Sequence, residues 1–230
     1  MKGVILGICP DVALVDISHE VPAHDVAAAA LEIAAAYKYF PAGTIFLTVV
    51  DPGVGSARRG LAAEAGDYRF VAPDNGVLTL VFREAPPKKV VELTERRYAR
   101  PTVSRTFEGR DRFAPAAAWL AKGIQLSALG RPLSDFQRLD VPVPEMDADG
   151  IRGVVLRVDR FGNLVTNIDR PLVERFAQGG ATYAELPREG VGALFGSTDH
   201  LELAASSASA AERLAIGRGA VVRLKRIANP

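Results

Sequence analysis

An apolar run at residues 45–50 is the feature that most constrains the fold of this chain. The run is short and rich in β-branched side chains, with Gly43 before it and Asp51-Pro52-Gly53 after it. This pattern is typical of a strand that is buried on both faces of an α/β sheet. Asp51 is therefore expected at the carboxyl end of the strand, which is the edge where open α/β sheets bind their ligands.

The turn that follows this strand carries two oppositely charged side chains. Pro52 disfavours a helical conformation at Asp51, while Gly53 and Gly55 allow the backbone to turn sharply and to approach a ligand. Asp51 and Arg58 bracket the turn, and a carboxylate beside a guanidinium can hold a polar nucleophile or a zwitterionic substrate. The turn by itself is equally compatible with a structural role in which Asp51 caps a neighbouring amide.

Strand and helix patterns alternate along the first part of the chain. Residues 25–40 are rich in alanine and favour a helix, and Gly123 is a suitable stop for a helix over residues 112–122. Alternation of this kind implies a mainly parallel sheet with covering helices, so we predict an α/β domain over residues 1–141. The other elements expected in this domain are strands at 13–17, 61–65, 68–72 and 89–93 and a short helix at 77–84.

The composition changes between residues 131 and 150, where prolines and acidic residues are frequent and apolar residues show little regular spacing. We place a domain boundary there and predict a second, smaller and β-rich domain over residues 149–230. Gly162 and Asn163 form the tight turn of an expected hairpin. The strands expected in this domain lie at 154–158, 164–168, 182–186, 201–205 and 220–227, with a short helix at 210–215.

The composition excludes several classes of function. The chain has 28 basic and 27 acidic residues, so no electrostatic attraction to nucleic acid or to an anionic membrane is implied. Cys9 is the single cysteine and the three histidines are scattered, which gives neither a disulfide nor the ligand spacing of a metal site. Apolar runs are too short for a membrane span, and because the apolar stretch of the first residues is short and wrongly ended, we expect no signal peptide there. We expect a globular protein of the reducing cytoplasm.

Five motifs follow one another between residues 16 and 168. They read DISHEVPAHDV at 16–26, VVDPGVGSARRG at 49–60, VAPDNGVLT at 71–79, TFEGRDRFAPAAAWLAKG at 106–123 and DRFGNLVTNI at 159–168. In order and spacing they resemble the S-adenosylmethionine hydroxide adenosyltransferases, relatives of the S-adenosylmethionine-dependent fluorinase and chlorinase. The resemblance covers nearly the whole chain. It implies an α/β amino-terminal domain, a smaller β-rich carboxyl-terminal domain, and a homotrimer with sites between one subunit's first domain and a neighbour's second.

The reaction implied by this resemblance is hydrolysis of S-adenosylmethionine to adenosine and L-methionine. Water attacks the ribose C5′ in line with the departing sulfonium sulfur, which leaves as a neutral thioether and needs no acid catalyst. The protein has to supply position, desolvation and a polarised nucleophile. No cofactor and no metal are expected, and the expected partners are the small-molecule substrate and identical subunits.

The resemblance also assigns three side chains to the handling of the water molecule. Asp51 matches the aspartate of the family's DPGVG turn, and Arg58 matches the arginine after it. The family's third member is a histidine in a TFHGRD motif, and this chain has Glu108 in its place. Gly109 keeps the small residue and the exposed amide of the motif beside the nucleophile.

Glu108 admits three interpretations. It replaces the imidazole as a proton acceptor, or it pairs with Arg58 and leaves Asp51 freer, or it impairs hydrolysis. Two carboxylates near one arginine add negative charge where hydroxide has to form. We expect retained but altered hydrolysis, because carboxylates are common general bases. The neighbouring Arg110 and Asp111 are expected to form a structural pair that starts the next helix.

In the second domain, the motif DRFGN resembles the family's clamp for adenosine and methionine. Phe161 would stack on adenine, Asn163 would hydrogen-bond its edge, and Asp159 would accept from the methionine ammonium group. Ser197 and Ser206 fall where the family contacts the methionine carboxylate and adenine, and the second of these positions is usually asparagine. Burial tendencies alone favour a core position for Phe161.

A second departure from the family concerns the start of the sequence. Family members carry a further stretch before the segment that matches MKGVI, with a first strand that ends in TDFG and an aspartate that holds the ribose hydroxyls. Met1 falls where they often have an internal methionine. We expect this strand to be missing, which weakens binding and exposes a sheet edge. Asp16 and His19 also match a family motif, and we expect a strand-end hydrogen-bonding role for them rather than catalysis.

Two alternatives to the hydrolase stay open. One is a catalytically weak or inactive protein that binds S-adenosylmethionine or adenosine, because Glu108 and the missing strand depart from the pattern. The other is an S-adenosylmethionine-dependent halogenase, which is less favoured because Asp51 and Arg58 keep the hydrolase pattern.

Overall fold

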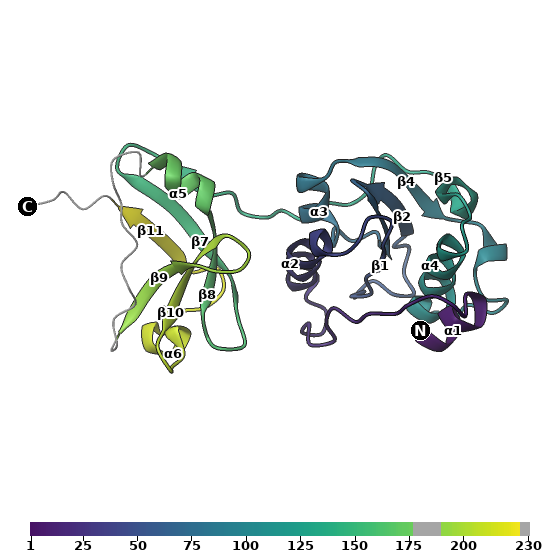
Figure 1. Ribbon diagram of the computed structural model, residues 1–230, viewed down its shortest axis with the longest axis horizontal. Coiled ribbons are helices and arrows are strands. Elements are labelled where there is room, and N and C mark those ends of the chain that lie inside the picture. Colours follow the sequence, from purple (N-terminus) through teal and green to yellow (C-terminus); the bar gives the residue numbers. More distant parts are fainter. Residues whose placement is uncertain (177–189, 226–230) are drawn as a thin grey trace, which may run out of the picture. The chain divides into compact units, whose positions relative to one another are not determined.

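A computed structural model of the chain describes residues 1–176 and 190–225 (Figure 1). The chain divides into two compact units, Met1–Leu139 and Asp140–Pro230. The strand predicted at 182–186 lies outside the described residues. Within the described residues, no helix combines the length and the apolar character needed to cross a membrane.

The first unit is built on a five-stranded sheet with the strand order β1-β3-β2-β4-β5. Strand β1 is parallel to β3, whereas β2 is antiparallel to both β3 and β4, and β4 is antiparallel to β5. The predicted α/β class is confirmed, but the sheet is mixed rather than mainly parallel. The reason is local, because Gly66 adopts a φ of +57° and lets β2 turn directly into β3 as a hairpin. The strands are β1 (Ile45–Leu47), β2 (Gly60–Ala65), β3 (Tyr68–Pro73), β4 (Pro87–Leu93) and β5 (Gly130–Pro132).

Helices cover both faces of this sheet. Alternate strand residues face opposite sides, so Leu61 and Ala63 pack with one set of helices while Ala62 packs with another. The first face carries α2 (Val26–Ala36) and α3 (Thr79–Glu84), and the second carries α4 (Ala114–Ala121). The unit is therefore a three-layer α/β/α arrangement whose core is split into two by the sheet. Short helical turns complete it at η1 (Tyr37–Tyr39), η2 (Arg96–Tyr98), η3 (Gly109–Phe113) and η4 (Leu126–Leu129).

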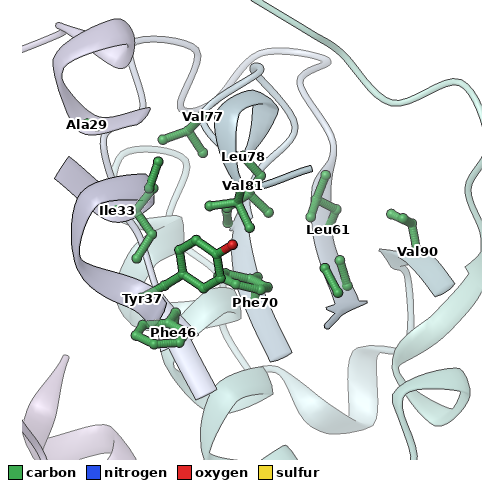
Figure 2. Close-up of a cluster of buried hydrophobic side chains, with 14 of the residues drawn as sticks. Ala29, Ile33, Tyr37, Phe46, Leu61, Phe70, Val77, Leu78, Val81 and Val90 are labelled. Atoms are coloured by element: carbon green, nitrogen blue, oxygen red, sulfur yellow. The ribbon is translucent and has the colours of Figure 1, made fainter. Parts of the chain in front are cut away.

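An aromatic group fills the core on the α2 side (Figure 2). The rings of Phe46 and Phe70, from the parallel strands β1 and β3, stack with centroids 5.2 Å apart. Tyr37 meets Phe70 edge to face at 5.9 Å, and its hydroxyl donates to Glu84 at 3.0 Å. Burial, with the carboxylate of Glu84 beside it, raises the pKa of Tyr37 to about 12. This packing fixes β1, the strand that leads into Asp51, against the centre of the sheet.

Four strands have an end at one edge of the sheet. Strands β1, β3 and β4 finish at this edge and β2 starts there, as their parallel and antiparallel pairings require. The segments that follow residues 47, 73 and 93 and the segment that precedes residue 60 therefore meet at one place. Asp51 and Arg58 both lie on the loop that joins the end of β1 to the start of β2.

The first residues fold differently from the prediction. Helix α1 (Lys2–Ile8) was not expected, and its Ile5 packs against Ala114 and Ala118 of α4. The strand predicted at 13–17 is wrong, because this segment finds no ladder partner among the described residues. Strand β1 lies at the edge of the sheet with β3 as its one partner there, and a cavity of about 750 Å³ separates it from residues 12–19.

The second unit is β-rich, as predicted. Its main path has the order β11-β7-β8-β10-β9, β6 pairs with β7, and all these pairings are antiparallel. Helix α5 (Arg170–Phe176), which was not predicted, packs its Leu172 with Ile151, Ile168 and Leu201. The other elements are β6 (Glu145–Met146), β7 (Gly150–Val158), β8 (Leu164–Asp169), β9 (Val191–Phe195), β10 (His200–Ala205), α6 (Ala210–Leu214) and β11 (Val221–Lys225).

Candidate active site

Asp51 and Arg58 form a buried ion pair at the edge where β1 ends and β2 begins. The Nε of Arg58 donates to Oδ1 of Asp51 at 2.9 Å, and Nη2 of the same guanidinium donates to Oδ2. The side chains are only 6% and 8% exposed, respectively. A two-pronged contact of this kind fixes both groups in one plane. The contact predicted between these two residues is thus present, and the turn is more than a capped loop.

The turn between them is shaped by close backbone contacts. Gly55 has a φ of +79°, and a Cβ there would collide with the carbonyl oxygen of Arg105. The Nδ2 of Asn75, from the turn after β3, donates to the carbonyl oxygen of Val50 at 2.9 Å. The two turns predicted at strand ends are therefore joined to each other, and the segment before Glu108 is held against the first of them.

Glu108 completes the cluster from a third segment of the chain. Its Oε2 accepts from Nη2 of Arg58 at 2.6 Å, and its side chain is 11% exposed. Of the three interpretations, the structure shows the pairing with Arg58. It does not show a freed Asp51, which keeps both of its bonds to the guanidinium. Gly109 has to be small, because a Cβ there would lie 2.8 Å from Cγ1 of Val49.

Sequence reasoning missed Arg112. Its Nη1 donates to Oε1 of Glu108 at 3.1 Å and its Nη2 donates to the carbonyl oxygen of Leu93 at 2.7 Å. The two residues are four apart, with Glu108 at the N-cap of the π-helical turn η3 and Arg112 inside it, and such turns are frequent at functional sites. The spacing of a glutamate four residues before an arginine is a signal that could have predicted the pair.

Arg58 retains one hydrogen-bonding group without a partner. Its Nη1 is buried and has no hydrogen-bond partner in the described structure, while the guanidinium lies 5.2 Å from the centre of the Phe113 ring. A buried donor without a partner carries a desolvation penalty of about 1–3 kcal/mol, so such groups usually serve a ligand or water. This NH₂ group is therefore a candidate donor to a bound molecule.

Asp111 is a structural neighbour of the cluster. Its fully buried carboxylate accepts from Nε of Arg110 at 2.7 Å, from Nη1 of Arg100 at 3.1 Å and from the amide of Ser104 at 2.9 Å. The Arg110 guanidinium above all, with the Ser104 amide and Arg100, holds the pKa of Asp111 well below its usual range, although burial opposes this. The predicted pair of Arg110 and Asp111 is confirmed, and it ties residues 100–104 to the start of α4.

Asp16 and His19 are far more exposed than this cluster. Nε2 of His19 lies 3.3 Å from Oδ1 of Asp16, and the two side chains are 70% and 44% exposed. A hydrogen bond from Lys2 is the main cause that lowers the pKa of Asp16. The two residues contact each other as a hydrogen-bonding role requires, but no strand ends there.

In the second unit, residues 159–163 form a turn that is held by its own side chains. Oδ1 of Asp159 accepts from the amides of Phe161 and Asn163, each at 2.8 Å, and Nδ2 of Asn163 donates to Oδ2 of Asp159 at 3.0 Å. Phe161 is 77% exposed, so the core position that burial tendencies favour is wrong. The turn presents the ring to solvent, and Oδ1 of Asn163 accepts no hydrogen bond from the residues that the structure describes.

The remaining predicted residues of this unit lie in loops. Ser197 and Ser206 are both exposed, on either side of strand β10. Glu202 of that strand was not predicted. Burial and the nearby Asp159 raise the pKa of Glu202, with burial the larger cause. The nearby Arg157 and His200 oppose this shift.

The described residues contain no group of three or more histidine, cysteine, aspartate or glutamate side chains arranged to hold a metal ion.

Comparison with family models gives two matches. The amino-terminal domain of SAM hydroxide adenosyltransferases matches residues 1–130, and the carboxyl-terminal domain of the same enzymes matches residues 153–223. The chain belongs to this family. The predicted resemblance is therefore confirmed, across both units.

Curated relatives and solved structures agree with this assignment. An (R)-S-adenosyl-L-methionine hydrolase of Thermus thermophilus is 39% identical over 241 residues, which cover 97% of this chain and 92% of the relative. A fluorinase of Actinoplanes sp. is 33% identical, covering 83% of this chain and 73% of the relative. The crystal structure of an uncharacterized conserved protein from Thermotoga maritima superposes with a TM-score of 0.91 at 31% identity, covering 98% of this chain and 93% of the other.

Proposed function

We propose that this protein hydrolyses S-adenosyl-L-methionine to adenosine and L-methionine. The observation that carries the proposal is the buried cluster of Asp51, Arg58 and Glu108, in which Nη1 of Arg58 has no hydrogen-bond partner among the described residues, in a member of this family. A relative that is 39% identical over nearly the whole chain has the name of this activity. The substrate is accordingly a small molecule.

The chemistry requires few catalytic groups. Oxygen of water bonds to C5′ of the ribose as the bond from C5′ to sulfur breaks, and the electron pair of that bond stays on sulfur as the thioether of methionine. The water gives up a proton, for which Asp51 is the proposed acceptor. Nη1 of Arg58 is the proposed donor that orients the water oxygen. Burial of the pair strengthens these contacts, because water competes less for them.

The second unit is proposed to bind the substrate. Phe161 would stack on adenine, which its exposure supports, and Asn163 would offer its free Oδ1 to the adenine edge. Asp159 would accept from the methionine ammonium group, since a carboxylate has lone pairs beyond those used in the turn. Ser197 and Ser206 would contact the methionine carboxylate and adenine.

The oligomeric state, the lack of a cofactor and the cellular compartment are also proposals. The family resemblance supports a homotrimer in which each site combines the first domain of one subunit with the second domain of a neighbour. Light scattering during size-exclusion chromatography should give the mass of three chains, and a monomer with full activity would contradict the shared site. We further propose that no cofactor is needed and that the protein works in the cytoplasm, in keeping with its single cysteine.

Incubation of the purified protein with S-adenosyl-L-methionine tests the activity directly. Chromatography should show adenosine and methionine appearing in equal amounts, in buffer without halide, with and without a metal chelator. Release of methylthioadenosine alone would indicate spontaneous breakdown of the substrate. Wild-type protein that releases no more adenosine than heat-denatured protein would overturn the proposal.

The main competing function is a weak or inactive binder of S-adenosylmethionine or adenosine, which the glutamate at position 108 favours. Calorimetry that shows binding of S-adenosylmethionine without adenosine release would select this alternative. A halogenase is the other, since a fluorinase is among the relatives. It would require a 5′-halo-5′-deoxyadenosine product whose amount rises with added chloride or fluoride.

A further inference from the structure

Arg112 contacts the charged cluster, but the proposed reaction gives it no role. We infer that Arg112 is a positioning residue: it fixes Glu108 against Arg58 and offsets the negative charge that Glu108 brings to the site. The inference rests on the proposed function and deepens it. It assigns a task to a side chain that never has to touch the substrate.

The contacts of Arg112 leave its guanidinium little freedom. Nη2 donates to the carbonyl oxygen of Leu93, the last residue of β4, at 2.7 Å, so the side chain is tied to the sheet edge. Nη1 donates to Oε1 of Glu108 at 3.1 Å. The other oxygen of the same carboxylate accepts from Arg58 at 2.6 Å. Glu108 is thus held between two guanidinium groups, one on each oxygen.

The contact between Arg112 and Glu108 differs from an ordinary pair on a helix surface. Exposed pairs four residues apart contribute only a few tenths of a kcal/mol, because water screens them and both side chains move. Here Glu108 is 11% exposed and Arg112 is 28% exposed, and each has a second fixed partner. The pair therefore fixes Glu108, and through it Arg58, relative to the end of β4. It is not an isolated ion pair on the surface.

The charges point to the same role. Asp51, Arg58 and Glu108 together carry one net negative charge, which opposes the formation of a hydroxide-like nucleophile beside them. Arg112 brings the four side chains to zero in an alternating row of carboxylate and guanidinium. A neutral residue at position 108 would need no such partner.

The role of Glu108 follows from this arrangement. The two oxygens of Glu108 accept from two different arginines, Arg58 and Arg112, whereas, among the described residues, both oxygens of Asp51 accept from Arg58 alone. Glu108 therefore holds Arg58 in the orientation that leaves Nη1 without a partner, and Asp51 stays the proposed proton acceptor. Arg112 acts on the reaction through Glu108 and Arg58.

A double-mutant cycle tests this coupling. Steady-state kcat and KM for S-adenosyl-L-methionine are measured for R112M and R112K, each in the wild-type and in the E108H background. We expect R112M to lower kcat about ten- to a hundred-fold with KM changed by less than about two-fold, as strongly coupled neighbours do. R112K keeps the charge but loses one donor, so it should recover part of the loss. In the E108H background, R112M should change kcat by less than about two-fold.

Arg96 provides a matched control. It lies with Arg112 in the wall of a cavity of about 710 Å³, and it is exposed. R96M removes the same charge from the same cavity, and we expect wild-type kcat and KM. The inference is overturned if R112M behaves like R96M, or if R112M lowers kcat by the same factor in the E108H background as in the wild type.

Two further measurements distinguish failure of this inference from misfolding of a variant and from failure of the proposed function. Thermal unfolding shows whether R112M folds, and if it does not, R112K and the E108H/R112M double variant decide the question. If the wild type releases no adenosine, the proposed function fails. Coupling between Arg112 and Glu108 is then measured in the free energy of unfolding of R112M, E108Q and the double variant, and additive effects would contradict it.

Discussion

The charged cluster around Arg58 is held by residues far apart in the chain, whereas the turn at residues 159–163 is held by itself. Arg58 pairs with Asp51 of its own turn and with Glu108, which lies 50 residues further along the chain, and each side chain is at most 11% exposed. The turn closes through Asp159, which accepts from residues two and four positions later. It leaves Phe161 77% exposed.

This difference separates two tasks within one proposed site. A buried cluster with fixed charges can stabilise a reaction without reorganising, which is the condition under which electrostatic groups lower a barrier. An exposed ring on a self-contained turn offers surface to a ligand at little cost to folding. Substitutions in the cluster should therefore change kcat and stability, and substitutions in the turn should change KM.

Asp51→Asn should produce the largest effect. The amide keeps the shape of the carboxylate but cannot accept the proton, so kcat should fall about 10²- to 10⁴-fold, the usual contribution of a positioned base. KM should change little. Adenosine release under saturating substrate measures this, with Asp67→Asn, an exposed aspartate of the same unit, as the control. A variant that keeps a tenth of the wild-type kcat would show that Asp51 is not the proton acceptor.

Among these substitutions, Asp111→Asn should cause the largest decrease in the free energy of unfolding. It leaves Arg110 and Arg100 without their buried carboxylate, which should lower the free energy of unfolding by about 3 kcal/mol. The pKa of Asp111 is lowered in the folded state, so its contribution is present above the unfolded value of about 3.9 and is lost as the pH falls below it.

Urea unfolding at pH 7 and pH 3 measures this effect. The difference between wild type and variant should be large at pH 7 and should shrink at pH 3. Asp135→Asn is the control, because Asp135 pairs with Arg59 while 77% exposed. An equal difference at both pH values would show that Asp111 acts through packing alone.

Phe161→Ala should affect substrate binding and leave folding unchanged. Stacking of a base on an aromatic ring contributes about 1–3 kcal/mol, so KM should rise about 5- to 150-fold while kcat stays within a few-fold. The melting temperature should not move, because the ring is exposed. Tyr39→Ala removes another aromatic ring that is 73% exposed and should change neither quantity. A fall in kcat without a rise in KM would break the division of tasks between cluster and turn.

Glu202→Gln should give the smallest effect. The pKa of Glu202 is raised by burial and by Asp159, so the charged form is disfavoured in the folded state. Its favourable contribution is present at low pH and is lost as the pH rises through the raised value. The variant should gain less than about 1 kcal/mol at pH 7 and nothing at pH 4, measured by urea unfolding of the whole chain. A loss of stability at pH 7 would show that Asp159 does not oppose the charge of Glu202.

Much of the fold was predictable from local patterns. The alanine-rich segment 25–40 became α2 because alanine favours helices and Asp25 caps the first turn by accepting from the amide of Ala28. The hairpin at 159–163 followed from its glycine. The strand expected at 13–17 failed, because an apolar run becomes a strand only where a neighbouring strand pairs with it.

The candidate site was predictable in part. Asp51 and Arg58 belong to one short turn, so their spacing predicted their contact. Glu108 was placed by resemblance, and its four-residue spacing from Arg112 is a local signal for their contact, but the second contact of Arg112, with the carbonyl oxygen of Leu93, depends on where β4 ends. No local pattern contains that information, since Leu93 and Arg112 lie on different elements.

The sequence by itself determined the family, the α/β class of the first unit, the β-rich second unit and the pairing of Asp51 with Arg58, because short-range patterns and ordered motifs encode these. Only the tertiary structure decided that the sheet is mixed, that Phe161 is exposed and that Glu108 is clamped between Arg58 and Arg112. The physical reason is that strand direction, burial and ion pairing depend on which distant segments meet at one edge of the sheet.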